Sequence, residues 1–295
     1  MKILFAFDDS EPARAARAIL ARLPLSKGSE ITVLTVAEDS GHVLSQLHGE
    51  DEAVLEAARA EGERAALALA RSAAEELRRT AVDVHLVART GHVTREILSQ
   101  VRDLGVDLLV TGARGLSTFD RLVLGSVAAE LLSDAPCSLL LARTGPAGEP
   151  EPGQPLEIVF ATDGSKPAGV AADQLAALPL GDRARVHVVT VLELISGFGA
   201  EVQQRLSAAW HREKDFARAH VEDVKARLEA TGAIVDTEVL ESEDVADSIA
   251  RIAEMKGADL LVIGHRGRGL LSRMSPGRIA RQVAQLAPCS VWIAK

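Results

Sequence analysis

The sequence contains two copies of one long pattern, and this duplication limits the possible folds more than any other feature. The segment ILFAFDDSEPA at 3–13 returns as IVFATDGSKPA at 158–168, which lies 155 residues later. The segment DLLVTG at 107–112 returns as DLLVIG at 259–264, which lies 152 residues later. Because the repeat is about 150 residues long, each copy has the length of a whole domain and not of a solenoid unit. The sequence therefore predicts two equivalent domains in tandem.

A segment rich in proline and glycine separates the two copies. Between Gly145 and Pro155 the chain has four prolines and three glycines among eleven residues. Such a composition is typical of a linker, because it supports neither a helix nor a central strand. We expect the first domain over residues 1–147, the linker over 148–156 and the second domain over 157–295.

Each copy alternates short apolar runs with longer amphipathic segments. In the first copy we expect strands over 3–7, 31–36, 82–88, 107–111 and 138–142. We expect helices over 13–23, 52–79, 94–104 and 126–133. The apolar runs are rich in β-branched residues, as buried parallel strands are, and parallel strands are joined by helical crossovers. The pattern predicts an α/β protein with two five-stranded, parallel, doubly wound sheets.

Composition and charge exclude several classes of protein. The formal net charge is −9, which argues against broad electrostatic contact with a nucleic-acid backbone. No run approaches the roughly 20 apolar residues that cross a bilayer, and the amino-terminal apolar run is too short for a signal peptide. The two cysteines lie far apart and imply no disulfide framework. We therefore expect a soluble, cytoplasmic protein with no nucleic-acid or membrane partner.

The most specific chemical signal follows the fourth expected strand of the first copy. Two residues separate Gly112 from Gly115, and nine more residues precede Gly125 and Ser126. Ligands of doubly wound sheets bind outside the carboxyl ends of the strands, and glycines let the backbone approach a phosphate. A helix that begins at Ser126 would add free N–H groups and a hydroxyl. The pattern predicts a polyphosphate site, with the alternative that the glycines only turn the chain.

Neither of two common phosphate-binding motifs describes these glycines. No lysine follows the last glycine, as a P-loop requires, and the glycines follow the fourth strand instead of the first, unlike the dinucleotide fingerprint. The glycine pattern, with Asp8 at the end of the first strand, instead resembles the ATP-binding branch of the universal stress protein family. The whole chain resembles the tandem form of that family, with two such domains in one polypeptide.

This resemblance implies a fold, an assembly and a ligand. The domains would be Rossmann-like, of the adenine nucleotide alpha-hydrolase type, and the two copies would form a pseudo-dimer within the chain. A homodimer of whole chains and a protein partner of unknown identity remain open. The ligand would be ATP, with Mg²⁺ held mainly by the phosphate oxygens, so that no metal site is built from side chains alone.

The resemblance also implies roles for named positions of the first copy. Asp8 and the backbone near Val36 would hold the adenosine, and Gly112 would lie against the ribose. The phosphates would accept hydrogen bonds from four further positions: Gly115, Gly125, Ser126 and Val127.

The second copy keeps this pattern with one departure. Five positions match those of the first copy: Asp163, Val191, Gly264, Gly267 and Gly277. Arg278, however, stands where the family has serine or threonine. Its guanidinium either pairs with a phosphate or blocks the pocket. Because a bulky residue fits a tight phosphate turn poorly, we expect the first copy to bind ATP more tightly.

No residue in the sequence stands out as a catalytic nucleophile or general base. Asp9 and Asp120 are weak candidates for a carboxylate near the terminal phosphate, and we expect Asp9 to face solvent. Cys137 and Cys289 occupy equivalent positions and are expected to pack as small buried residues. We predict an ATP-binding sensor or adaptor of the stress response. A slow ATP hydrolase or phosphotransferase, or an interaction protein with vestigial pockets, remains the alternative.

Overall fold

The computed structural model describes residues 1–38, 52–78, 82–114, 124–145, 154–194, 200–267 and 277–295. The chain divides into two compact units, Met1–Arg143 and Thr144–Lys295. They are called the first unit and the second unit.

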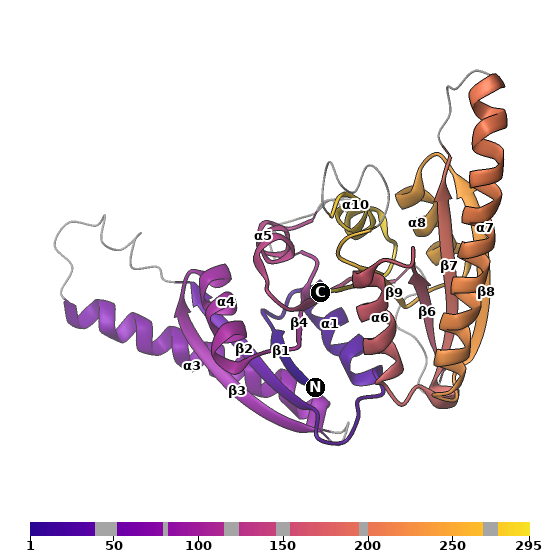
Figure 1. The fold of residues 1–295 in the computed structure, drawn as a ribbon. Helices are drawn as coiled ribbons and strands as arrows, with labels where there is room; N and C mark the ends of the chain where they lie inside the picture. Colours follow the sequence, from indigo (N-terminus) through magenta and orange to yellow (C-terminus); the bar gives the residue numbers. More distant parts are fainter. Residues whose placement is uncertain (39–51, 79–81, 115–123, 146–153, 195–199, 268–276) are drawn as a thin grey trace. The chain divides into compact units, whose positions relative to one another are not determined.

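The first unit is a parallel five-stranded sheet with helices on both faces (Figure 1). Its strands are β1 (Lys2–Ala6), β2 (Glu30–Glu38), β3 (Asp83–Gly91), β4 (Leu108–Gly112) and β5 (Ser138–Ala142), in the order β3-β2-β1-β4-β5. Its helices are α1 (Glu11–Arg22), α3 (Glu52–Leu77), α4 (Val93–Leu104) and α5 (Ser126–Asp134). Helices α1 and α3 contact each other on one face of the sheet, and α4 and α5 contact each other on the other.

The second unit has the same topology. Its strands are β6 (Leu156–Ala161), β7 (Ala184–Glu193), β8 (Ile234–Ser242), β9 (Leu260–Gly264) and β10 (Ser290–Ala294), in the order β10-β9-β6-β7-β8. Its helices are α6 (Lys166–Ala176), α7 (Ala200–Glu229), α8 (Val245–Met255) and α10 (Arg278–Leu286), and the short 3₁₀ helix η2 (Gly181–Arg183) precedes β7. In both units the strand order reverses beside the first strand, so the predicted doubly wound fold is confirmed.

Local sequence explains how each unit turns from its first strand into its first helix. Ser10 caps α1 by accepting a hydrogen bond from the backbone N–H of Ala13, and Ser165 caps α6 in the same way from Ala168. Proline stands in the first turn of both helices, where its missing N–H costs no hydrogen bond. The repeated Ser-x-Pro segment therefore places a helix start directly beyond β1 and β6.

The expected elements of the first copy are all present, with ends shifted by up to three residues. The largest shift is at β3, which continues to Gly91 because it pairs with β2 as far as the partners Glu38 and Gly91. The last residues of β3 are polar and only half-buried, since this strand has a single neighbour. An apolar pattern cannot mark the end of such a strand.

The edge strand β8 carries charged residues beside a buried histidine of β7. His187 lies between Asp236 and Glu238, with its Nδ1 2.5 Å from Asp236 Oδ1 and its Nε2 3.1 Å from Glu238 Oε2. Burial alone would raise the pKa of Asp236, but the hydrogen bond and charge of His187, joined by Lys256, outweigh it and hold the pKa below its ordinary value. The outermost strand is thus tied to its neighbour by ionic contacts.

Candidate functional site

An aspartate follows the first strand of each unit and is held by the turn into the helix. The carboxylate of Asp8 accepts hydrogen bonds at Oδ1 from the backbone N–H of Ser10 (3.0 Å) and from its hydroxyl (2.6 Å). Asp163 accepts in the same way from the backbone N–H of Ser165, at 3.0 Å. Each aspartate therefore has one orientation at the carboxyl end of its sheet, where ligands of this fold class bind.

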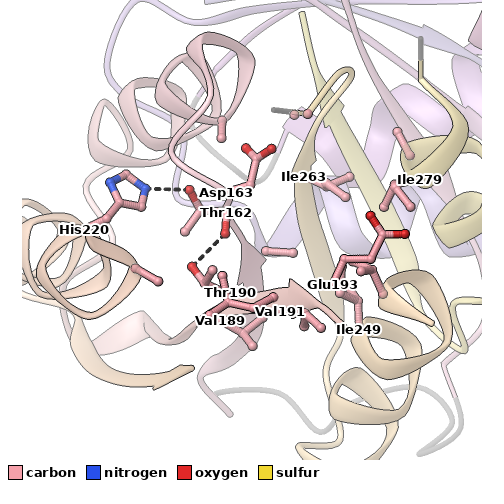
Figure 2. Close-up of a pocket in the computed structure, with 18 of the residues that line it drawn as sticks. Thr162, Asp163, Val189, Thr190, Val191, Glu193, His220, Ile249, Ile263 and Ile279 are labelled. Atoms are coloured by element: carbon pink, nitrogen blue, oxygen red, sulfur yellow. Dashed lines mark hydrogen bonds between the residues drawn. The ribbon is translucent and has the colours of Figure 1, made fainter. Parts of the chain in front are cut away.

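The second unit has a pocket of about 430 Å³ at this end of its sheet. All six positions that the sequence singled out in the second copy line it: Asp163, Val191, Gly264, Gly267, Gly277 and Arg278. They come from the ends of β6, β7 and β9 and from the start of α10. Figure 2 shows five of the residues that line this pocket: Asp163, Val191, Glu193, Ile263 and Ile279. The fold thus brings together residues more than 100 positions apart in the sequence.

The glycines of this pocket each have a structural reason. A Cβ atom on Gly264 would lie 2.7 Å from the backbone N of Ala168, and one on Gly267 would lie 2.7 Å from Asp163 Oδ2. Gly277 has a φ of +80°, in the left-handed region that favours glycine. In the first unit, a Cβ on Gly112 would lie 2.9 Å from Pro12 Cβ. Close packing on the first helix of each unit, α1 or α6, therefore accounts for Gly112 and Gly264 even before a ligand is considered.

Arg278, at the start of α10, is only partly buried. Its guanidinium lies 3.8 Å from the carboxylate of Glu193 and donates a 3.2 Å hydrogen bond to Gln282 Oε1. Glu193 also lines the pocket. The arginine thus meets a carboxylate of its own chain, and a phosphate in the pocket would compete with that carboxylate for the same donor.

A small polar group lies deep in the pocket (Figure 2). The hydroxyl oxygen of Thr162 lies 2.8 Å from His220 Nε2, and the hydroxyl of Thr190 donates to the carbonyl of Thr162 at 2.7 Å. His220 stacks on Phe216, with 6.2 Å between the ring centroids and 3° between the ring planes. These bonds join β6, β7 and α7 at the floor of the pocket.

Helix α7 supplies the part of the site that the sequence analysis missed. Four of its large side chains line the pocket: Trp210, Glu213, Phe216 and His220. Their spacing by three and four residues puts them on one side of a helix. That spacing is visible in the sequence, but the same spacing also marks a helix face that packs into a core. It becomes informative only when the pocket is known.

In the first unit, the structure places six of the seven candidate residues. These are Asp8, Val36, Gly112, Gly125, Ser126 and Val127, all at the carboxyl ends of β1, β2 and β4 or at the start of α5, whereas Gly115 lies outside the described residues. Gly125 has a φ of −63° and a ψ of 155°, and its N–H donates to the carbonyl of Ala113 at 2.9 Å. Ser126 is exposed at the first position of α5.

The comparison with known families decides the identity of the fold. The model of the universal stress protein family matches residues 1–143 and 157–295. The chain belongs to the universal stress protein family. Both copies match, so the tandem arrangement predicted from the repeat is confirmed.

Known relatives agree with this membership. A universal stress protein of Bacillus subtilis is 27% identical over 145 residues, which is 48% of this chain and 98% of that protein. One of Methanocaldococcus jannaschii is 30% identical over 139 residues, which is 47% of this chain and 81% of that protein. Half of the chain thus aligns with nearly the whole of the Bacillus protein.

A crystal structure shares the fold over the full length. It is that of a universal stress protein from Archaeoglobus fulgidus, which covers 100% of this chain and 96% of its own, with 18% identity and a TM-score of 0.64. At this identity the likeness concerns the fold.

The structure describes three of the four remaining candidates of the universal stress protein chain. Asp9 has a φ of 59° and forms a 3.3 Å ion pair with Arg14, with about half of each side chain exposed. Asp120 lies outside the described residues. Cys137 and Cys289 are both buried, so that expectation is confirmed.

The described residues contain neither a membrane-spanning helix nor a cluster of metal-binding side chains. None of the described helices is long and apolar enough to cross a membrane. Among the residues that the structure places, no group of three or more histidine, cysteine, aspartate or glutamate side chains could hold a metal ion.

Proposed function

We propose that this universal stress protein binds ATP, as its Mg²⁺ complex, at the carboxyl end of each sheet and acts as a nucleotide-dependent sensor or adaptor of the stress response. One observation carries the proposal: the six second-copy positions chosen from the sequence for nucleotide binding all line one pocket. Pockets of about 300–1,000 Å³ at the ends of doubly wound strands are common sites for small ligands, and the 430 Å³ pocket falls in that range.

The chemistry of the lining residues supports a nucleotide. The first-turn N–H groups of α10 have no partner within the helix and suit phosphate oxygens. Arg266 adds positive charge to the pocket. The carboxylate of Asp163 can accept hydrogen bonds from ribose hydroxyls. In the first unit, Asp8 and the start of α5 occupy the corresponding places.

Calorimetric titration of the whole chain with Mg-ATP tests this proposal. A carboxylate at the start of α5 or α10 would repel phosphates, so we expect Gly125→Asp and Gly277→Asp each to remove one site and the double variant to remove all binding. Gly125→Asn and Gly277→Asn are matched controls, since asparagine has the same shape without the charge and tolerates left-handed backbone. The proposal is wrong if the double Asp variant, still folded, binds ATP as the wild type does.

The sensor role requires that ATP favours one conformation of the chain, by no more than its difference in affinity for the two. Hydrogen exchange with and without Mg-ATP measures this at the first turns of α5 and α10. We expect slower exchange there when ATP is bound. Equal exchange throughout the chain at saturating ATP would argue against a sensor.

Hydrolysis has less support in the described residues. Asp9, one of two weak carboxylate candidates, is turned toward Arg14 and half exposed. We expect any turnover of ATP to be slow, and a coupled phosphate-release assay with the Asp9→Asn variant measures whether this carboxylate contributes to it.

A further inference from the structure

Helix α7 presents an aromatic wall to the pocket of the second unit. Trp210, Phe216 and His220 line the pocket together with Glu213. The four residues follow one another at intervals of three, three and four, so they form a broad strip on the side of the helix that lines the pocket. Phe216 keeps 45% of its surface exposed, which is high for a large apolar side chain. An aromatic surface that remains partly open beside a pocket is available to a ligand.

The indole of Trp210 is held in place by a chain of polar contacts. Its Nε1–H donates to Glu241 Oε2 at 3.2 Å, and Glu241 also forms an ion pair with Lys214, one turn along α7. The hydrogen bond from Lys214 holds the pKa of Glu241 below its ordinary value, and that from Trp210 acts in the same direction. Glu241 therefore stays an acceptor at neutral pH, and the ring has its orientation before a ligand arrives.

The matching helix of the first unit has no such wall. Four buried positions of α7 lie 151 residues after four buried positions of α3, in the order Ala217, Val221, Val224 and Leu228 after Ala66, Ala70, Ala73 and Leu77. In this alignment Trp210 corresponds to Arg59 and Phe216 to Ala65.

Between Arg59 and Ala65, the first unit has a glycine where the second unit has a large side chain. Glu213 corresponds to Gly62 in the same alignment. A Cβ on Gly62 would lie 3.4 Å from the Cβ of Ala37, directly after Val36 on β2. Helix α3 thus approaches its strand closely where α7 carries large side chains, and the two units differ on this side of the sheet.

We propose that Trp210 is the stacking surface for the planar base of the ligand in the second unit, and that this contact makes binding in the second unit depend more on the base than binding in the first. The inference rests on the proposed function, because it assumes a nucleotide in this pocket. Every base has a flat π-face, and an aromatic ring held in advance stacks on it without a further loss of freedom. The first pocket, with Arg59 and Ala65 at the matching positions, relies on the phosphates instead.

The test uses the full chain with Gly125→Asp, which leaves the second pocket as the site under study. Three probes separate base from phosphate: Mg-ATP, adenosine and inorganic tripolyphosphate. The chain has two tryptophans, and Trp292 is 1% exposed, so a ligand in the pocket changes the fluorescence of Trp210. We expect ATP and adenosine to quench this fluorescence and tripolyphosphate to leave it unchanged.

Substitution of Trp210 measures the contribution of stacking. We expect Trp210→Leu to weaken the binding of adenosine and of ATP by about 10- to 100-fold, since stacking of a base contributes on that order. The affinity for tripolyphosphate should not change. Trp210→Phe keeps a ring and should restore most of the affinity. Arg212→Leu changes an exposed residue of the same helix and is the matched control, with no expected effect. Circular dichroism confirms that each variant is folded.

Two results separate a failure of this inference from a failure of the proposed function. Unchanged affinity for adenosine in Trp210→Leu, or ATP binding without a change in Trp210 fluorescence, overturns the stacking role while ATP binding itself stands. No binding of ATP by the wild-type chain overturns the proposed function, and the stacking role with it.

Discussion

The two units share one topology and one set of turns but differ at the residues that would face a ligand. At the end of the first strand, the first unit has Phe7, which is buried and lies under the guanidinium of Arg17, 5.9 Å from the ring centroid. The second unit has Thr162 there, with a hydroxyl bonded to His220. Duplication preserved the strands and caps, which carry the fold, and let the pocket side chains diverge. The comparison therefore separates residues that both units need for the fold from residues that differ at the pocket end of the sheet.

The last glycine of the motif shows this separation most clearly. Gly277 has a φ of +80°, whereas Gly125 has a φ of −63° that any residue adopts. An alanine in the left-handed region costs about 1–2 kcal/mol. We expect Gly277→Ala to lower the free energy of unfolding by that amount and Gly125→Ala, at a buried N-cap without backbone strain, to lower it by less. Scanning calorimetry, which reports the melting of each unit, checks both.

The backbone conformation at Gly125 does not require glycine, so phosphate binding is the remaining reason to test. If the first pocket binds phosphate, Gly125→Ala should weaken Mg-ATP there although the unit stays stable. Equal losses of stability in both variants would contradict the difference between the two backbones.

The residue after that glycine, Ser126 or Arg278, is expected to make the two units differ in their affinity for ATP. Ser126 offers a hydroxyl at the start of α5, and Arg278 is engaged by Glu193 at 3.8 Å. We expect Ser126→Arg to weaken ATP binding in the first unit by about fivefold, which corresponds to one lost hydrogen bond of about 1 kcal/mol. Arg278→Ser together with Glu193→Gln should strengthen ATP in the second unit by a similar factor, because both the bulk and the competing carboxylate are gone.

Titration calorimetry on chains with the other site silenced measures these factors. Glu193→Gln alone is the control that frees Arg278 without removing it. Weaker binding in the double variant than in that control would show that Arg278 pairs with a phosphate, and the expectation that it obstructs the pocket would be wrong.

The turn after the first strand allows an exchange between the units. Asp9 has a φ of 59° and Gly164, at the matching position, a φ of 68°. Aspartate tolerates this left-handed conformation, but the conformation is less favourable for aspartate than for glycine. We therefore expect Gly164→Asp to lower the free energy of unfolding by about 0.5–1 kcal/mol. Asp9→Gly should change it by less than about 0.5 kcal/mol, because relief of strain is offset by the flexible glycine and the lost exposed ion pair. Urea unfolding of each variant against wild type tests this, and a stabilised Gly164→Asp would refute it.

The smallest expected difference is a pH dependence at His265, where the first unit has Ala113. Burial lowers the pKa of His265, the hydrogen bond from its Nδ1 to the carbonyl of Ala294 opposes this, and the charges of Arg266 and Lys295 lower it further. An unfolded histidine titrates near pH 6.5. As the pH falls through that value, the unfolded chain takes up a proton before the folded chain does, so stability decreases.

A non-titrating variant isolates this contribution from that of the other histidines. Asparagine at position 265 can still donate to the Ala294 carbonyl. We expect His265→Asn to lose less of its free energy of unfolding than the wild type between pH 7 and pH 5. Parallel pH profiles for the two proteins would show that His265 does not contribute.

The fold was predictable because its signals are local or repeated. The duplicated strand of 3–7 and its Ser-x-Pro cap define one βα turn twice, and the apolar runs define the remaining strands. The glycine positions could also be placed, since their spacing follows a strand that the pattern identifies. The polar end of β3 could not, because a half-exposed edge strand has no apolar signal.

The character of the second pocket could not be predicted in the same way. The ion pair of Arg278 with Glu193 joins residues 85 positions apart, and the sequence around neither residue predicts it. Trp210 and Phe216 lie on a long helix whose pattern is equally typical of a core face. Only the approach of α7 to β7, a tertiary contact, decides which side of that helix meets the pocket.

The ionic contacts around His187 also bear on how the protein avoids aggregation. Strand β8 has one neighbour, β7, so its outer backbone groups are open to pairing with a strand of another molecule. An incoming strand would bring its own side chains beside Asp236 and Glu238, and a second copy of β8 would bring the same negative charges. Charged residues on an edge strand are a known protection against such association. The carboxylates that fasten β8 to its own sheet therefore also discourage the growth of that sheet into a larger one.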